Sequence, residues 1–158
     1  MITVAIVTVS DSVTAGTRED RSGPALAEKV SEFGWAIAYS RAVSDDPEQI
    51  SKVLVELTGV DVIVTTGGTG VALRDVTPEA TVAVSDRRID GFGELMRRKG
   101  AEKTRFAYLS RGAAYTRGDV LIVNLPGSPK GAVESLEAVA ELIPHVVDLL
   151  HGRTEHGG

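Results

Sequence analysis

The 158-residue chain contains no cysteine, and aromatic residues make up only 4% of it. The absence of cysteine excludes disulfides, zinc–thiolate sites and cysteine nucleophiles, and it fits a cytoplasmic location. Since aromatic side chains are scarce, the hydrophobic core must be built from Val, Ile, Leu and Ala. A single domain of this length can bury roughly two thirds of its unfolded surface, so one such core is expected.

The chain also lacks a basic stripe and a long apolar run. Its formal net charge is −5, so we expect no nucleic-acid partner. The first residues, MITVAIVTVSDS, lack the basic start and cleavage site of a signal peptide. No apolar run reaches the roughly 20 residues needed to cross a bilayer, so we expect no membrane partner. An anionic ligand stays possible, because charges more than about 8 Å away are largely screened.

Short apolar segments rich in β-branched residues alternate with amphipathic segments along the chain. The pattern predicts strands over residues 3–9, 35–43, 61–65 and 120–125, and helices over 22–33, 46–58, 78–85, 91–99 and 131–150. We expect Pro144 to kink the last helix, and residues 106–109 fit either a strand or a helix. Mostly apolar strands alternating with helices favour an α/β fold, with a mostly parallel sheet covered on both faces. Residues 1–150 are predicted to form one domain, and residues 151–158 a frayed tail.

Polar segments follow the ends of four predicted strands. They are residues 10–12, 44–46, 66–75 and 126–130. In open α/β sheets, ligands bind in the crevice beyond the carboxyl ends of the strands. Ser10, Asp11 and Ser12 are therefore candidate binding residues, together with the residues of the other three segments.

Four prolines follow a residue that could cap a helix. Proline suits the first helical position, so the N-caps predicted from this pattern are Gly23, Asp46, Thr77 and Ser128. Gln49 lies three residues after Asp46, as in a capping box.

Two aspartates at neighbouring strand ends, Asp45 and Asp75, have no such capping position. They are candidate functional carboxylates. The alternative interpretation is that each is a solvated loop aspartate or forms a local Asx turn.

The segment TTGGTGVALRDVTPE, residues 65–79, holds three glycines within four positions. It matches neither the phosphate-binding GxxxxGK[ST] motif nor the dinucleotide-binding GxGxxG motif. Two interpretations remain open. The backbone N–H groups could form an anion-binding nest, or the glycines could form a tight strand-to-helix turn that binds nothing.

Seven segments together resemble the MoaB/Mog family of molybdenum-cofactor biosynthesis proteins, to which the gephyrin-type G domain also belongs. They occur in the family's order over about residues 3–150: VTVSDS (7–12), DRSGP (20–24), TTGGTG (65–70), RDVTPEAT (74–81), GFGELMR (91–97), LSR (109–111) and LIVNLPGSPK (121–130). The resemblance implies a three-layer α/β/α domain with a mostly parallel sheet, usually a homotrimer. It also implies a molybdopterin adenylyltransferase, which moves AMP from ATP to the terminal phosphate of molybdopterin, releases pyrophosphate and requires Mg²⁺.

The resemblance also implies roles for particular residues. Asp45 and Asp75 match two functional aspartates, so we expect them to be catalytic and to bind Mg²⁺. Thr69 matches a threonine implicated in molybdopterin binding, and Ser110 a serine implicated in handling the adenylylated product. With the strand-end segments, the predicted substrate-binding set is Ser10, Asp11, Ser12, Thr66, Gly67, Gly68, Thr69, Gly70, Ser110, Pro126, Gly127 and Ser128.

Other functions remain open at this point. The chain could bind molybdopterin without catalysis, as a carrier. It could be an assembly module, a trimeric scaffold that hands the cofactor to a partner protein such as the one that inserts molybdate. It could also bind a nucleotide only. The two aspartates favour the enzyme.

Overall fold

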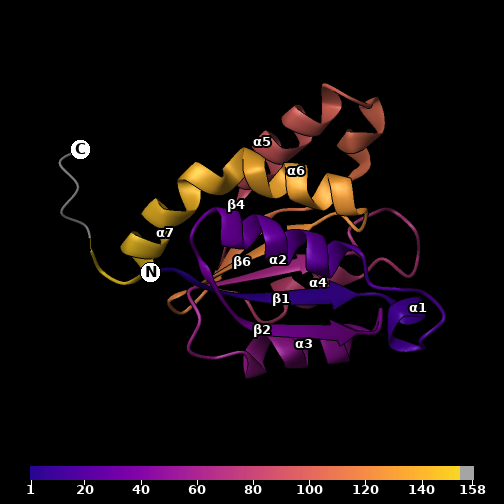
Figure 1. The fold of residues 1–158 in the computed structure, drawn as a ribbon, viewed down its shortest axis with the longest axis horizontal. Helices are drawn as coiled ribbons and strands as arrows, with labels where there is room; N and C mark the ends of the chain where they lie inside the picture. Colours follow the sequence, from indigo (N-terminus) through magenta and orange to yellow (C-terminus); the bar gives the residue numbers. More distant parts are fainter. Residues whose placement is uncertain (154–158) are drawn as a thin grey trace.

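The computed structural model describes residues 1–153, so residues 154–158 of the expected tail lie outside the described residues. Strands and helices mostly alternate along the chain (Figure 1), although α2 follows α1 and β6 follows β5. Their bounds are β1 (Thr3–Val9), α1 (Asp11–Thr14), α2 (Ser22–Glu32), β2 (Ala36–Val43), α3 (Pro47–Glu56), β3 (Val62–Thr66), α4 (Thr77–Val82), β4 (Arg87–Ile89), α5 (Asp90–Ala101), η1 (Arg105–Leu109), β5 (Ala114–Arg117), β6 (Val120–Leu125), α6 (Pro129–Val139), η2 (Ala140–Leu142) and α7 (Ile143–Leu150), where η marks a 3₁₀ helix.

The strands form one six-stranded sheet in the order β2-β1-β3-β6-β5-β4. The pairs β1–β2, β1–β3 and β3–β6 are parallel, while β5 runs antiparallel to both β6 and β4. The predicted α/β fold with a mostly parallel sheet is confirmed. Strands β4 and β5 were not expected, and the undecided segment 106–109 lies in a 3₁₀ helix.

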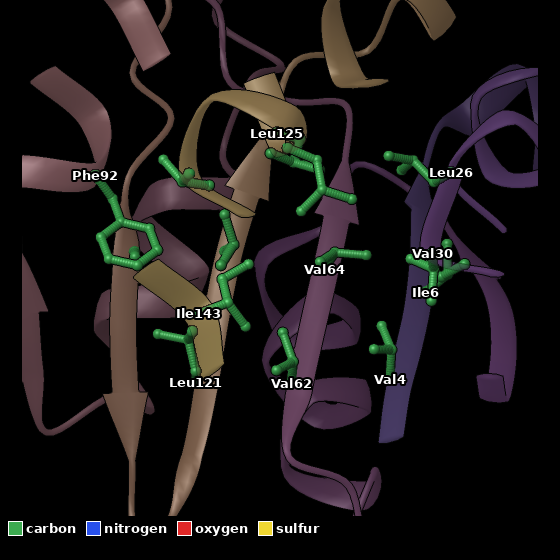
Figure 2. Packing of buried hydrophobic residues seen from close by; sticks show 14 of the residues in the cluster. Val4, Ile6, Leu26, Val30, Val62, Val64, Phe92, Leu121, Leu125 and Ile143 are labelled. Carbon is green, nitrogen blue, oxygen red and sulfur yellow. The ribbon is translucent and has the colours of Figure 1, made fainter. Parts of the chain in front are cut away.

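Helices cover the sheet on both faces, which gives three layers. Alternate residues of β1 point to opposite sides: Val4 and Ile6 belong to one apolar cluster with α2, α5, α6 and α7, and Ala5 and Val7 to another with α3 and α4. Figure 2 shows the first cluster, in which Leu26 faces the central strands. The parallel strands β1, β3 and β6 are buried along most of their length, whereas the edge strand β2 is partly exposed. The carboxyl ends of all four parallel strands lie at one edge of the molecule, where α1 lies in Figure 1.

Two of the four predicted helix caps are confirmed. The Asp46 side chain accepts a hydrogen bond from the Gln49 N–H at the start of α3, and Ser128 accepts from the Gly131 N–H at the start of α6. The prediction for Thr77 was wrong, because Thr77 is the first residue of α4 and its hydroxyl donates instead to the Gly67 carbonyl.

The prediction that Gly23 caps α2 was also wrong. The helix already begins at Ser22, and the Asp20 side chain accepts from the Gly23 N–H.

The predicted kink near Pro144 is confirmed. The long C-terminal helix is broken by the turn η2, which begins at Ala140, four residues before the proline. Proline cannot donate to the carbonyl four residues back and its ring collides with that carbonyl, so the chain tightens there. No helix within residues 1–153 has the length and apolar character to pass through a membrane.

Candidate functional site

A polar cavity of about 600 Å³ opens at the carboxyl ends of the parallel strands. The end of each of these four strands contributes to its wall, as the fold rule for α/β sheets requires. Eight of the predicted residues line it: Ser10, Ser12, Asp45, Thr66, Gly67, Gly68, Asp75 and Gly127. The two candidate carboxylates therefore lie on one cavity.

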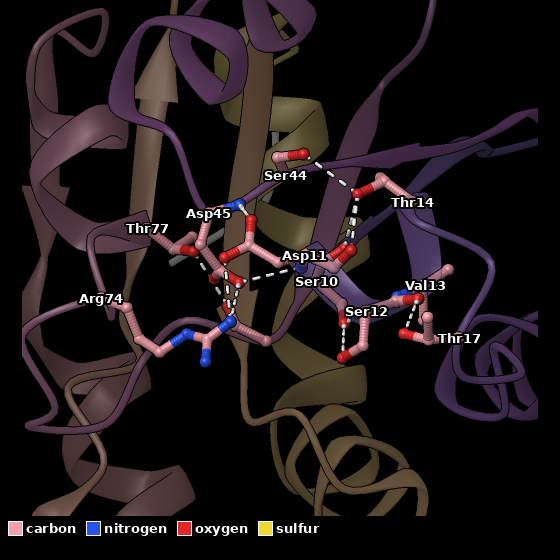
Figure 3. A network of polar contacts seen from close by, with 11 residues as sticks. Ser10, Asp11, Ser12, Val13, Thr14, Thr17, Ser44, Asp45, Arg74 and Thr77 are labelled. Carbon is pink, nitrogen blue, oxygen red and sulfur yellow. Dashed lines mark hydrogen bonds and ion pairs between the residues drawn. The ribbon is translucent and has the colours of Figure 1, made fainter.

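The first wall is built by the turn after β1. Ser10 is the N-cap of α1, and its hydroxyl accepts from the Val13 N–H at 3.3 Å. Asp11 is bound to the loop after β2 by a reciprocal pair of hydrogen bonds (Figure 3). Its carboxylate accepts from the Asp45 N–H at 2.8 Å, while the Asp45 carboxylate accepts from the Asp11 N–H at 3.1 Å. Asp11 thus connects two strand ends, and it lies outside the residues that line the cavity.

Asp45 is held beside an arginine and two other carboxylates. Its side chain is only 9% exposed, and the Arg74 guanidinium lies 4.0 Å from Asp45 and 2.9 Å from Asp11. Burial raises the pKa of Asp45 above its ordinary 3.8, and the charges of Asp11 and Asp75 add to this. The Asp11 N–H and Arg74 act in the opposite direction. A cation placed here would stabilise the charged form of Asp45.

The glycines at the end of β3 are needed for the turn itself. Gly67 and Gly68 both have positive φ, +105° and +70°, a backbone region that other residues rarely adopt. A Cβ at Gly67 would overlap the Val9 carbonyl oxygen, and one at Gly68 would overlap the Thr77 hydroxyl and come within 3.3 Å of the Asp45 carboxylate. The turn therefore requires glycine at both positions, and it brings the backbone close to Asp45.

The loop after this turn carries Asp75. Its carboxylate accepts from the Ala72 N–H at 3.0 Å, and a Cβ at Gly70 would lie 2.7 Å from it. The carbonyls of Thr69 and Gly70 both accept hydrogen bonds from Arg111, at 2.7 and 2.8 Å. Thr69 is buried, and neither Thr69 nor Gly70 is among the residues that line the polar cavity.

The remaining three predicted residues lie beside a second, smaller cavity. Ser110, Pro126 and Ser128 line a space of about 270 Å³, together with Met96 and Phe106. Its lining is more apolar than that of the first cavity. Gly127 lines the first cavity while its two neighbours line the second, so the turn after β6 separates them.

Arginines are the residues that the sequence interpretation left without a role. Arg18, Arg21 and Arg74 line the polar cavity, and Arg111 binds the loop that carries Asp75. The sequence pointed to Arg74 through the Arg-Asp pair at 74–75, and to Arg111 through the LSR segment at 109–111. Neither pattern predicts which residues the guanidinium contacts.

The residues around the cavity suit a magnesium ion that is bound partly by substrate and water, rather than a metal held by protein ligands alone. Within residues 1–153, no group of three or more His, Cys, Asp or Glu side chains is placed to hold a metal ion. Mg²⁺ typically uses one or two carboxylates and completes its shell with substrate oxygens and water. Asp45 and Asp75 accept few hydrogen bonds from the protein, and a carboxylate can accept about four, so both keep oxygen lone pairs for a metal.

Comparison with known proteins identifies the family. A sequence profile described as a probable molybdopterin-binding domain matches residues 5–145. The chain belongs to this family. Together with the relatives and the solved structure of this family, this match confirms the resemblance to the MoaB/Mog proteins.

Relatives within this family are similar over most of their length. The molybdopterin adenylyltransferase of Helicobacter pylori (strain 26695) is 44% identical, over 96% of this chain and 89% of the relative. That of Escherichia coli K12 is 39% identical, over 94% and 78%. The crystal structure of the molybdopterin biosynthesis enzyme MoaB from Thermus thermophilus superposes with a TM-score of 0.90 at 48% identity, covering 96% of this chain and 98% of that one.

Proposed function

We propose that this chain is a molybdopterin adenylyltransferase, which transfers AMP from MgATP to the terminal phosphate of molybdopterin. The observation that carries the proposal is the placement of Asp45 and Asp75 on one polar cavity at the carboxyl ends of the sheet. The names of the relatives at 44% and 39% identity support the same activity.

The two neighbouring cavities suit the two halves of the product. The polar cavity, with Asp45, Asp75 and three arginines, fits the phosphates of ATP. The smaller cavity offers apolar walls with a few hydroxyls, including those of Ser110 and Ser128, which is the usual lining for a flat organic ring. The pterin would bind there, with its phosphate directed past Gly127 toward ATP.

The reaction needs no nucleophile from the protein. An oxygen of the molybdopterin phosphate attacks the α-phosphorus of ATP, the bond from that phosphorus to the β-phosphate oxygen breaks, and pyrophosphate leaves. Rate enhancement must then come from positioning and from neutralising charge. Arg18, Arg21 and Arg74 line the cavity beside the carboxylates of Glu19, Asp20, Asp45 and Asp75. The three guanidiniums would offset part of the repulsion between two anionic substrates.

Magnesium would supply the remaining positive charge, neutralising the oxygens on which negative charge develops. Asp45 and Asp75 are the residues that would hold it. Arg74 lies against Asp11 and within 4.0 Å of Asp45, so its guanidinium partly compensates the charge of the buried Asp45 carboxylate.

The wider setting is part of the same proposal. The protein would act in the cytoplasm, where ATP is available, as a homotrimer. Its product, adenylylated molybdopterin, would pass to a partner protein that inserts molybdate. The family membership and the named relatives support the pathway. Sedimentation of the purified chain tests the trimer.

One assay tests the activity. Purified protein is mixed with molybdopterin and MgATP, and pyrophosphate and adenylylated molybdopterin are measured together. We expect both products in equal amounts. An ATP analogue with a methylene bridge between the α- and β-phosphates is the control, because it cannot release pyrophosphate.

Two other results would overturn the proposal. Binding of molybdopterin without pyrophosphate release would make the protein a carrier. Affinity for ATP with none for molybdopterin would make it a nucleotide-binding protein.

A further inference from the structure

The loop of residues 70–75 places Asp75, yet apolar packing does little to hold it. Val71 is 69% exposed and Leu73 fully exposed, so hydrophobic burial cannot fix the loop. Within the loop, Asp75 N–H donates to the Ala72 carbonyl and Ala72 N–H donates to the Asp75 carboxylate. These bonds set the shape of the loop but do not attach it to the rest of the domain.

Arg111 attaches this loop to the domain through both its backbone and its side chain. Its N–H donates to the Thr69 carbonyl at 2.7 Å. Its guanidinium donates through Nε to the Gly70 carbonyl at 2.8 Å and through Nη2 to the Asp75 carbonyl at 2.7 Å. The side chain therefore spans the loop from its first residue to its last, and the last is the candidate carboxylate itself.

The guanidinium is itself held from α4. Its Nη1 forms an ion pair with the Glu79 carboxylate, which leaves Nε and Nη2 directed at the loop. A planar fork with donors in fixed directions can make these three contacts at once, whereas the single ammonium of lysine cannot reproduce them. The Arg74 side chain also connects the loop to the domain, through ion pairs with Asp11 at 2.9 Å and Asp45 at 4.0 Å, but Arg74 is 62% exposed.

We propose that Arg111 is a positioning residue for the reaction, which holds the Gly70–Asp75 loop so that the Asp75 carboxylate keeps its place at the polar cavity. As a statement about catalysis, this proposal rests on the proposed function. Arg111 also follows Ser110, which lines the smaller cavity. One short segment therefore contributes to the proposed pterin site and fixes the loop of the proposed phosphate site.

Arg111→Lys tests the proposal by turnover and by hydrogen exchange. Misplacing a reacting group by about 1 Å can cost up to about 100-fold in rate, so we expect kcat to fall about 10- to 100-fold. KM for ATP should stay within about twofold, because Arg18 and Arg21 line the polar cavity from outside the loop and are unchanged. Amide exchange in residues 69–76 should become about tenfold faster, because local opening is no longer opposed by the fork.

Two matched variants separate positioning from a general loss of stability. Arg117→Lys removes a guanidinium contact of the same kind, from Arg117 to the Val84 carbonyl, and Arg117 lines neither cavity. Its turnover should equal that of the wild type. Arg97→Lys weakens bonds to the Ser110 and Gly112 carbonyls on either side of Arg111, while the Arg111 side chain and its contacts with the loop are unchanged. Its exchange over residues 69–76 should stay at the wild-type rate.

The outcomes distinguish this proposal from the proposed function. Wild-type exchange of residues 69–76 in Arg111→Lys would overturn the positioning role, whatever the activity. Faster exchange with unchanged kcat would overturn its importance for the reaction. If the wild-type protein shows no adenylylation at all, the proposed function fails, and the exchange data still decide whether Arg111 holds the loop.

Discussion

The floor and the rim of the polar cavity are built by different forces. The floor is the end of β3 and the turn that follows, where Thr65 and Thr66 are buried and Gly67 packs against the Val9 carbonyl. The rim is the loop 70–75, whose side chains are largely exposed and which is held by hydrogen bonds and ion pairs. Packing therefore determines the geometry of the floor, while a few polar contacts determine that of the rim.

This difference separates stability from activity. A substitution in the floor should lower the free energy of unfolding more than it lowers turnover, because dense packing tolerates little extra volume. A substitution in the rim should lower turnover with little change in the free energy of unfolding, because the rim buries little apolar surface. Each of the following variants either sharpens this contrast or breaks it.

The largest effect is expected from Asp75→Asn, on the rim. Asn can still accept the hydrogen bond from the Ala72 N–H, so only the charge is lost. We expect turnover to fall roughly 100-fold or more, because a proposed magnesium ligand is removed. The free energy of unfolding should change by less than about 0.5 kcal/mol. Turnover equal to wild type at saturating MgATP would remove Asp75 from the mechanism.

The next effect is expected from Gly67→Ala, on the floor. The added Cβ would overlap the Val9 carbonyl oxygen at a φ of +105°, so we expect a loss of about 3 kcal/mol in the free energy of unfolding. Gly59→Ala is the matched control. Gly59 also has positive φ, +74°, but has no neighbouring atom within 4 Å of the added group, so it should cost about 1 kcal/mol. Equal losses in urea denaturation would contradict the packing account of the floor.

A smaller effect is expected from Asp46→Ala, beside the cavity. Asp46 caps α3 through the Gln49 N–H, and losing such a cap costs about 1 kcal/mol. Its neighbour Asp45 lines the cavity and Asp46 does not, so turnover should be retained. Selective loss of turnover with an unchanged melting temperature would mean that the roles of the two aspartates are reversed.

The smallest effect is expected from Glu79→Gln, which removes the charge that holds Arg111. The hydrogen bond from Arg111 lowers the pKa of Glu79 below its ordinary 4.5. The ion pair thus stabilises the fold above pH 4.5, and this contribution is lost as the pH falls through the lowered pKa. Because the Glu79 side chain is 58% exposed, the ion pair contributes about 0.5 kcal/mol or less to the free energy of unfolding. The variant's unfolding free energy should depend less on pH below 4.5, and an unchanged pH dependence would show that the pair contributes nothing.

Local patterns predicted the parallel part of the fold well. Strands β1, β3 and β6 are apolar because helices bury them on both faces, so runs such as TVAIVTV are visible in the sequence. Strands β4 and β5 were missed because they are three and four residues long and contain arginines. They form because β5 pairs antiparallel with β6 and β4 pairs antiparallel with β5. The sequence of one short segment does not show such pairing.

The same limit applies to the site. Asp45 and Asp75 could be picked out because the ends of parallel strands meet at one edge and neither residue follows the capping pattern. Arg111 could not be assigned, since it acts on Asp75 from 36 residues away. The cap prediction for Thr77 failed for a similar reason, because a carbonyl ten residues away takes its hydroxyl.

The central claim is that the Asp45 and Asp75 carboxylates act on one bound group. A double-mutant cycle tests it most directly, with pyrophosphate release measured for Asp45→Asn, Asp75→Asn and the double variant at saturating MgATP and molybdopterin. Residues that act as a unit are strongly non-additive, so the double variant should turn over about as fast as the slower single variant. Losses that multiply would show that the two carboxylates act independently and would contradict the account.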